Sequence, residues 1–433
     1  MHRGPGASGS SDEEAARVVL VTNRPHGHDS VVPLCGAYAL VAVALDRNRL
    51  AHKDFCQPGY SLLALGYSLL ALEAAIVRRN VISVNSERLC GELRMSKAMK
   101  PWALVTGAGG FIGHHLVSYL KSAGYRVRGA DIKPPEYSGT DADEFMLLDL
   151  RELKNCETCT TGMDFVYHLA ADMGGIGYIT GSHAGIAHNN SLMNLHMLEA
   201  SRRNDVGRFL FSSSACVYPQ GLQTSPDVTP LREEDAFPAE PEEGYGLEKL
   251  YAEKLCQYHM EDYGLSTRVV RFHNVYGPLG TYDGGREKAP AAMCRKVACA
   301  PNPGRIEVWG DGKQTRSFMY VDDCVEGIHR IMRSNYIEPL NLGTDELVSV
   351  DELAEIVIGA SEKKIALVHD LTKPQGVRGR NSDNTRLRAV LQWEPQMTLR
   401  KGIVPTYHWI AGQTAAAASV ENSVIAGATV AAE

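Results

Sequence analysis

The chain has 433 residues, 44% of them hydrophobic, which is enough for two domains with cores of their own. Its formal net charge of -7 gives no overall attraction to nucleic acid or to an anionic membrane, so neither is an expected partner. Ten cysteines without the dense spacing of a small secreted scaffold predict free thiols in a reducing compartment, and we expect the cytoplasm.

Residues 1–98 lack sustained helix or strand periodicity and predict a poorly structured N-terminal extension. Within it, residues 59–65 recur unchanged as residues 66–72, a duplication too short to be a repeat array. The apolar run over 59–77 approaches the length of a membrane helix, but it contains Glu73 and lies far from the N-terminus. We therefore expect no membrane role.

From Trp102 onward, short β-branched runs alternate with helical patterns. This alternation predicts an α/β fold with a Rossmann-type, doubly wound parallel sheet, whose expected strands are 103–106, 126–131, 165–171, 208–213 and 268–272. The domains we expect are an NAD-binding Rossmann domain (99–273), a smaller C-terminal α/β domain that mainly binds substrate (274–412, with some segments returning to the first domain) and a disordered tail (413–433).

A GxxGxxG loop formed by Gly107, Gly110 and Gly113 follows the first expected strand and opens a helical pattern. Glycines let the backbone approach a pyrophosphate, and the helix N-terminus supplies amide hydrogens and a positive dipole end. Asp131 ends the next strand, where a carboxylate binds the adenosine ribose and repels a 2′-phosphate, so NAD is favoured over NADP. Lys133 weakens that preference slightly, and the alternative is a glycine turn beside an unrelated capping Asp.

Tyr245 and Lys249 are four residues apart, which places both side chains on one face of a helix. A free phenol has a pKa near 10, so it needs a neighbouring cation to act as a base at neutral pH. Lys249 can supply that charge and hold the nicotinamide ribose, while Ser214 can bind the same substrate hydroxyl. A YxxxK pair also arises by chance on solvated helices, but this trio follows a dinucleotide fingerprint and predicts hydride transfer between a sugar carbinol and NAD.

Seven segments resemble the GDP-mannose 3,5-epimerase family, whose members are NAD-dependent extended short-chain dehydrogenases. The likeness covers about residues 101–413 and lies in 168–175 (HLAADMGG), 213–218 (SSACVY), 242–249 (EEGYGLEK), 272–278 (FHNVYGP), 284–292 (GGREKAPAA), 309–318 (WGDGKQTRSF) and 376–384 (GVRGRNSDN). The N-terminal hundred residues and the tail show no such likeness.

The resemblance implies that GDP-D-mannose is oxidised at carbon 4 by NAD, epimerised at carbons 5 and 3, and reduced again to GDP-L-galactose. A ketone at carbon 4 acidifies both neighbouring C–H bonds, and inversion requires acid/base groups on the two faces of the ring. Cys216 and Lys288 are the implied pair. Cys216 stands two residues after Ser214 and therefore points into the same pocket. Dehydratases carry an acidic pair where this chain has Ala215 and Cys216, which argues against dehydration.

The remaining contacts follow from the same resemblance. Phe111, Ile112 and Asp149 join the glycines, Asp131, Tyr245 and Lys249 around the cofactor. The sugar is met by Gly174, Ser214, Ala215, Asn274, Glu287 and Ala289. The residues implied to bind the diphosphate are Lys296, Gln314, Thr315, Arg316 and Arg380, and Arg378 and Arg386 are further candidates. No metal is expected. The family also implies a homodimer formed through helices of the NAD-binding domain, and a product that feeds ascorbate and cell-wall sugars.

Three alternatives stay open at this point. Another nucleotide-sugar enzyme such as a 4-epimerase would need only Ser214, Tyr245 and Lys249. A non-catalytic NAD-binding scaffold would not need Tyr245 and Lys249 together. The third alternative is a redox or zinc-binding role for the CxxC pair Cys156 and Cys159. No second pair follows at metal spacing, so two ordinary thiols are the simpler interpretation.

Overall fold

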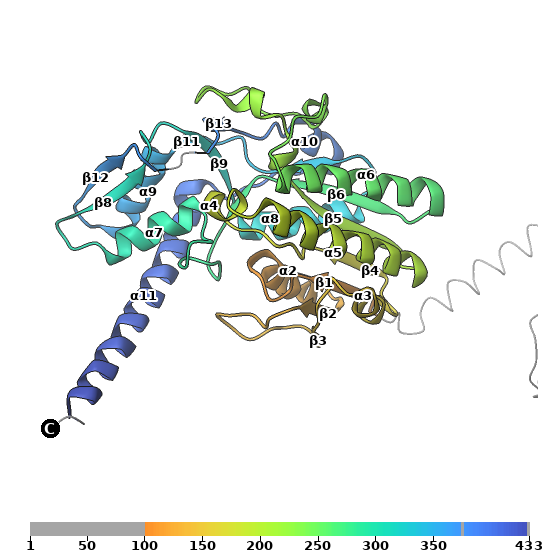
Figure 1. The fold of residues 1–433 in the computed structure, drawn as a ribbon, viewed down its shortest axis with the longest axis horizontal. Helices are drawn as coiled ribbons and strands as arrows, with labels where there is room; N and C mark the ends of the chain where they lie inside the picture. Colours follow the sequence, from red (N-terminus) through yellow and green to blue (C-terminus); the bar gives the residue numbers. More distant parts are fainter. Residues whose placement is uncertain (1–99, 374–375, 431–433) are drawn as a thin grey trace, which may run out of the picture. The chain divides into compact units, whose positions relative to one another are not determined.

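The computed structural model describes residues 100–373 and 376–430, so the expected extension and its duplication lie outside the described residues. The main layer is a seven-stranded sheet in which every neighbouring pair is parallel, in the order β10-β6-β5-β4-β1-β2-β3 (Figure 1). Its strands are β1 (Trp102–Thr106), β2 (Arg126–Asp131), β3 (Glu144–Leu147), β4 (Phe165–His168), β5 (Arg208–Ser214), β6 (Thr267–Phe272) and β10 (Leu340–Leu342). The predicted Rossmann-type fold is confirmed.

Helices cover both faces of this sheet, which is why its strands are apolar on both sides. One face carries α3 (Leu153–Thr160), α5 (His183–Arg203) and α6 (Tyr245–Tyr263), which contact one another in sequence. The other face carries α2 (Phe111–Ser122) and α8 (Val321–Arg333). Side chains alternate accordingly along β1: Ala103 and Val105 belong to the core with α2 and α8, and Leu104 to the core with α5 and α6.

A smaller lobe is built around β9 (Thr315–Tyr320), which pairs with β7 (Asn274–Tyr276), β11 (Leu347–Ser349) and β13 (Gly379–Arg380). Beside it, β8 (Gly304–Trp309) pairs in parallel with β12 (Ile365–Asp370). The helices of this lobe are α7 (Ala289–Cys299), α9 (Val350–Ser361) and α11 (Leu399–Val430), which pack together (Figure 1). Helix α10 (Thr385–Leu391) contacts β10. Both β10 and α8 return to the large sheet.

Two features differ from the sequence prediction. Helix α11 continues to Val430, where the sequence predicts a disordered tail from residue 413. An alanine-rich stretch begins in that region, and alanine has the highest intrinsic helix propensity. Strand β4 ends at His168, short of the predicted residue 171, because the chain turns into the site there. No helix in residues 100–373 or 376–430 combines the length and hydrophobicity that a bilayer crossing requires.

The strand order reverses between β1 and β4, and ligands of such sheets bind beyond the carboxyl ends of the strands at that point. Gly107 follows β1, the 169–175 segment follows β4, and Ser214 ends β5. Short elements continue from these ends: η1 (Ala215–Val217), η2 (Gln220–Gln223), η3 (Glu233–Ala236) and the single-turn helix α4 (Ile176–Ile179). The fold therefore brings the predicted motifs to one edge of the sheet.

Candidate active site

The glycine loop leaves no room for side chains where the sequence predicts a pyrophosphate. Gly107 adopts φ +70°, and a Cβ there would lie 2.9 Å from Ala170 N. A Cβ on Gly113 would collide with the carbonyl oxygen of Gly107, which also accepts a hydrogen bond from Gly110 N at 3.0 Å. Helix α2 starts directly afterwards with no side-chain cap, so its first amides are available to an anion.

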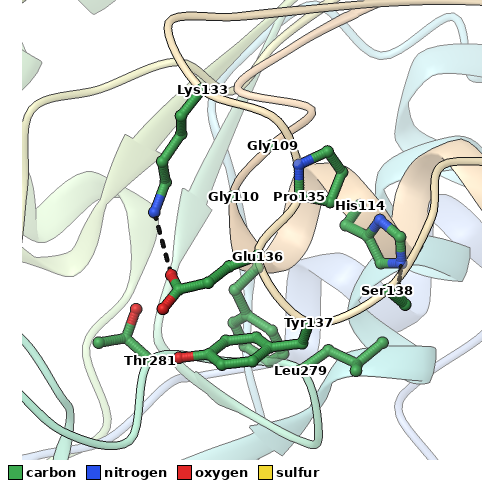
Figure 2. Close-up of a pocket in the computed structure, with 11 residues that line it drawn as sticks. Gly109, Gly110, His114, Lys133, Pro135, Glu136, Tyr137, Ser138, Leu279 and Thr281 are labelled. Atoms are coloured by element: carbon green, nitrogen blue, oxygen red, sulfur yellow. Dashed lines mark hydrogen bonds and ion pairs between the residues drawn. The ribbon is translucent and has the colours of Figure 1, made fainter.

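Asp131 at the end of β2 is fixed against this loop. Its carboxylate accepts hydrogen bonds from Gly109 N at 2.9 Å and from Lys133 N at 3.1 Å. The Lys133 ammonium forms an ion pair with Glu136 at 3.3 Å (Figure 2). The lysine that weakened the preference for NAD is thus matched by a second carboxylate. Asp149, also expected at the cofactor, is held in a two-point ion pair by Arg151 at 3.0 and 2.6 Å.

A pocket opens over the start of α2, between the chain after β2 and the 279–281 segment (Figure 2). Its lining includes Gly109, Gly110, Phe111, Tyr137 and Thr281. Phe111, the first residue of α2, also packs beneath Gly280, whereas Ile112 packs against the hydrophobic core. Of the two, only Phe111 faces the pocket.

Tyr245 and Lys249 lie on the first two turns of α6, and both are buried. Burial raises the pKa of Tyr245 well above its ordinary value, and a hydrogen bond with Ser214 opposes the rise. Lys249 is 1% exposed, and its ammonium nitrogen lies 5.6 Å from the centre of the Tyr245 ring. Burial lowers the pKa of Lys249, and the charge of Glu248 opposes this. The predicted trio is therefore brought together at the ends of β5 and α6.

The Lys249 ammonium has no hydrogen-bond partner among the described residues, and its nearest carboxylate oxygen, on Glu248, is 4.0 Å away. A buried ammonium group normally has hydrogen-bond acceptors around it, because a buried donor without a hydrogen bond is costly. The hydroxyls of a nicotinamide ribose would supply them. This unpartnered lysine and the glycine cradle both fit a bound NAD.

A buried chain of hydrogen bonds behind the trio was missed by the sequence prediction. Thr106 Oγ1 lies 2.9 Å from His168 Nδ1, His168 Nε2 lies 3.0 Å from Asn194 Oδ1, and Asn194 Nδ2 donates to Glu248 Oε1 at 2.6 Å. Burial lowers the pKa of His168 to about 3, so the ring is neutral and can accept from Thr106 while it donates to Asn194. The chain connects the residue before Gly107 to the neighbour of Lys249.

Cys216 lies in η1, where it is 7% exposed and shares a buried cluster with Tyr245. Its sulfur accepts a hydrogen bond from Arg380 Nη1 at 3.4 Å. Burial raises the pKa of the Cys216 thiol, and the Arg380 charge opposes the rise. Lys288 precedes the first residue of α7. Burial lowers its pKa, and among the surrounding charges that of Cys216 opposes this most. The two groups come from different elements and lie near enough for the charge of Cys216 to affect Lys288.

The other sugar contacts come from loops that meet around Lys288. Gly175 N donates to Arg286 O at 3.2 Å, and a Cβ on Gly175 would lie 2.8 Å from Glu287 O, so the two loops are held close together. A Cβ on Gly174 would press on the Tyr178 side chain of its own segment. Glu287 accepts from Gly285 N at 2.7 Å, and Asn274 Nδ2 donates to Ser317 O at 3.0 Å. Ala215 is buried beside Cys216, whereas Ala289 is exposed at the start of α7.

Arg316 and Arg380 lie close together on neighbouring strands β9 and β13. Burial, followed by the charge of Arg380, lowers the pKa of Arg316 to about 9. Arg316 donates to the carbonyl oxygens of Thr315 and Val377 at 2.7 and 2.6 Å, and no carboxylate in the described part of the chain forms an ion pair with it. Two partly buried guanidinium groups that have a single carboxylate nearby among the residues described, Glu242 at 3.8 Å from Arg380, suit an anionic ligand.

The remaining predicted phosphate contacts are more dispersed. Lys296 on α7 donates to Glu307 O at 2.7 Å and lies over the Trp309 ring. Gln314 is buried, and its side-chain oxygen has no hydrogen-bond partner within residues 100–373 and 376–430, whereas Thr315 Oγ1 donates to Pro226 O. The two further candidate arginines form ion pairs: Arg378 with Asp311 at 3.0 Å and Arg386 with Glu234 at 2.8 Å.

The CxxC pair lies in α3, away from these strand ends. Both thiols are buried and donate to backbone carbonyls, and burial raises the pKa of Cys159 to about 12. The described residues contain no group of three or more side chains arranged to hold a metal ion. Cys156 and Cys159 therefore fit ordinary structural thiols.

Comparison with known proteins agrees with this architecture. Residues 103–343 match the model of the NAD dependent epimerase/dehydratase family. GDP-mannose 3,5-epimerase from Arabidopsis thaliana is 49% identical over 311 residues, which cover 71% of this chain and 82% of that protein. GDP-mannose 3,5-epimerase 1 from Oryza sativa subsp. japonica is 50% identical, with coverage of 71% and 81%. The resemblance found in the sequence is thus confirmed.

Solved structures give the same result for the fold. The UDP-glucose 4-epimerase of Thermotoga maritima with UDP-glucose superposes with a TM-score of 0.65 at 26% identity, covering 72% of this chain and 99% of that one. The UDP-glucuronic acid 4-epimerase of Bacillus cereus, in complex with UDP-glucuronic acid and NAD, gives a TM-score of 0.62 at 25% identity with the same coverage. The chain belongs to the NAD dependent epimerase/dehydratase family.

Proposed function

We propose that the protein is an NAD-dependent GDP-mannose 3,5-epimerase that converts GDP-D-mannose to GDP-L-galactose. The observation that carries this proposal is the buried cluster of Cys216 with Tyr245, where Arg380 donates to the sulfur and the charge of Cys216 acts on Lys288. A 4-epimerase needs the trio alone, because it exchanges no proton at carbon. The two plant relatives at 49% and 50% identity support the same assignment.

Tyr245 takes the proton from the hydroxyl at carbon 4, and Ser214 holds that hydroxyl by a second hydrogen bond. Burial raises the pKa of Tyr245 and so favours the protonated phenol, and the positive charge of Lys249 is needed to stabilise the phenolate that acts as the base. A bound NAD would supply the hydride acceptor for the oxidation at carbon 4 and the hydride donor for the later reduction. The unpartnered Lys249 ammonium would bind its ribose.

Cys216 and Lys288 exchange protons at the two carbons next to the ketone. One group removes a proton from one ring face, and the other delivers a proton to the opposite face. A thiol and an amine suit this task because burial moves their pKa values toward each other, raising that of Cys216 and lowering that of Lys288.

The diphosphate binds at Arg316 and Arg380, which leaves the sugar within reach of Cys216. Arg380 donates to the Cys216 sulfur at 3.4 Å, so the phosphate-binding strand ends directly beside the thiol. Bidentate contacts from guanidinium groups would hold the phosphates in a fixed orientation. Orientation matters because a small misplacement of the reacting carbon lowers the rate strongly.

The working form is a homodimer in the cytoplasm. Leu195 on α5 and Leu247, Tyr251 and Tyr258 on α6 are large apolar residues exposed on helices of the NAD-binding domain. Such a group favours burial against a second copy. The seven described cysteines are free, which suits a reducing compartment. The product would supply ascorbate and cell-wall sugar synthesis.

The function is tested by incubating the protein with GDP-mannose and NAD in deuterated water and following the sugar by NMR. We expect deuterium at carbons 3 and 5 and a galactose configuration, with exchange reduced roughly 10²-fold or more in Cys216→Ala and Lys288→Ala. Tyr245→Phe should abolish transient NADH formation while NAD still binds. Wild-type protein that labels neither carbon would exclude the epimerase, and exclusive inversion at carbon 4 would indicate the 4-epimerase instead.

A further inference from the structure

Besides Arg380 and Lys288, a third charged side chain, that of Glu242, lies near the Cys216 thiol, and the proposed function gives it no role. Its carboxylate lies 3.8 Å from the guanidinium of Arg380, which also donates a hydrogen bond to the Cys216 sulfur at 3.4 Å. Its backbone N donates to Cys216 O at 3.0 Å. A Cβ on Gly246 would collide with that same oxygen and press on the Glu242 Cβ, so the two segments are in close contact.

The protonation of Cys216 poses a problem for the proposed reaction. Burial raises the pKa of the Cys216 thiol, the charge of Arg380 opposes the rise, and the charge of Glu242 adds to it. Even an ordinary thiol, with a pKa of about 8.5, carries its proton at neutral pH. A thiol that carries its proton cannot take one from carbon. Inversion at two carbons also requires that the same sulfur lose its proton again between the first and the second inversion.

We infer that Glu242 is the positioning residue that accepts the Cys216 proton and so prepares the thiolate for each of the two inversions. The inference rests on the proposed function. The S–H bond of Cys216 breaks, an O–H bond forms on Glu242, and the thiolate stays opposite Arg380. The thiolate then takes the proton from the sugar carbon and becomes a thiol again. No oxidation or reduction is involved.

Solvent access completes the proton balance. The Glu242 side chain is 15% exposed, so a proton placed on it can pass to water, whereas Cys216 is more enclosed. Each inversion therefore sends one proton out through Cys216 and Glu242, and Lys288 recovers from water the proton that it gave to the other face. The charged or titratable groups that face the thiol are Glu242 and Tyr245 near the start of α6, Lys288 at the start of α7, Arg316 on β9 and Arg380 on β13.

Glu242→Gln tests this relay, and Glu243→Gln is the matched control because Glu243 is exposed and its loss changes the charge equally. The first measurement is the thiolate ultraviolet absorbance against pH, with the spectrum of the same variant carrying Cys216→Ala subtracted. The second is the ratio of the product inverted at both carbons to the product inverted at carbon 5 alone, followed by NMR in deuterated water. A thermal melt of each variant checks its fold.

We expect Glu242→Gln to shift the Cys216 titration to lower pH, because a negative charge beside the sulfur is gone. In the same variant the second inversion should slow roughly 10²-fold, so that the single epimer accumulates. Loss of a merely structural contact would not lower the thiol pKa while it slows proton exchange. Glu242→Asp keeps the carboxylate and should recover part of the second inversion, and Glu243→Gln should match the wild type in both measurements.

The inference is overturned if Glu242→Gln keeps both the wild-type titration of Cys216 and the wild-type product ratio. It is also overturned if the control variant changes them as much. Wild-type protein that labels neither carbon would instead remove the proposed function, while the thiolate titration would still show whether Glu242 acts on Cys216.

Discussion

Replacing Asn194 by leucine would test the buried hydrogen-bond chain behind Lys249. Asn194 is 2% exposed, and leucine has a similar size without polar atoms. The substitution removes the acceptor for His168 Nε2 at 3.0 Å and the donor to Glu248 Oε1 at 2.6 Å. Because both partners stay buried, water does not replace the lost bonds.

The cost is set by the two partners that remain. A buried neutral donor without a partner costs about 1–3 kcal/mol, and a hydrogen bond to a charged group contributes about 1.5–3 kcal/mol. Additional apolar burial by leucine offsets part of this, at about 25 cal/mol per Å². We expect the free energy of unfolding to fall by about 2–4 kcal/mol. Released from Asn194, Glu248 can also move toward the Lys249 ammonium, which should lower kcat more than it affects NAD binding.

Urea unfolding followed by circular dichroism measures the loss, with His188→Leu as the control because His188 is exposed on the same helix. Exposed substitutions usually stay within about 0.5 kcal/mol. If Asn194→Leu fell within that range of the control, the hydrogen bonds would contribute nothing measurable, and the assignment of His168 as a neutral donor in the chain would have to be abandoned.

Three further results are expected. Burial lowers the pKa of His168 and His273 to about 3, so between pH 6.5 and 3 the unfolded chain binds protons that the folded chain does not, and the free energy of unfolding should fall as the pH drops. In His273→Asn, the slope of the free energy of unfolding against pH, measured by urea unfolding, should be smaller by one proton, about 1.4 kcal/mol per pH unit. An unchanged slope would contradict this. Gly113→Ala should abolish NAD binding measured by calorimetry, because its Cβ would displace Gly107; wild-type affinity would show that the loop yields. Tyr251→Glu should yield monomers in sedimentation, and a persistent dimer would place the interface elsewhere.

The central strands of the sheet were predictable because each is buried and consists mainly of apolar or β-branched residues. Strands β3 and β10 were not predicted. β3 is a partly exposed edge strand of four residues, and β10 has only three, so neither carries a periodic pattern long enough to stand out. Helix α11 runs beyond the predicted residue 412, because a run of alanines favours a helix without showing the amphipathic pattern that identifies one in a sequence.

The site was predictable to the extent that its residues follow strands or open helices. Gly107, Asp131 and Ser214 come directly from strand ends, and the sheet gathers them whatever the loops do. The contacts of Cys216 were not predictable in the same way. Arg380 reaches its sulfur across 164 residues of sequence, and Gln223, which holds the Arg380 side chain at 2.5 Å, comes from a short 3-10 turn with no recognisable motif.

The charges of the site explain why it should bind its substrate as an anion. Burial disfavours the charged forms of Cys216, Lys288 and Arg316, and repulsion by the Arg380 charge lowers the pKa of Arg316 further. The folded protein therefore carries an electrostatic cost at this strand edge that Glu242, 3.8 Å from Arg380, offsets only in part. A diphosphate placed between the two guanidinium groups removes their repulsion, so binding recovers free energy that folding had spent. A neutral sugar without phosphates could not do so, and it would leave both arginines as costly as before.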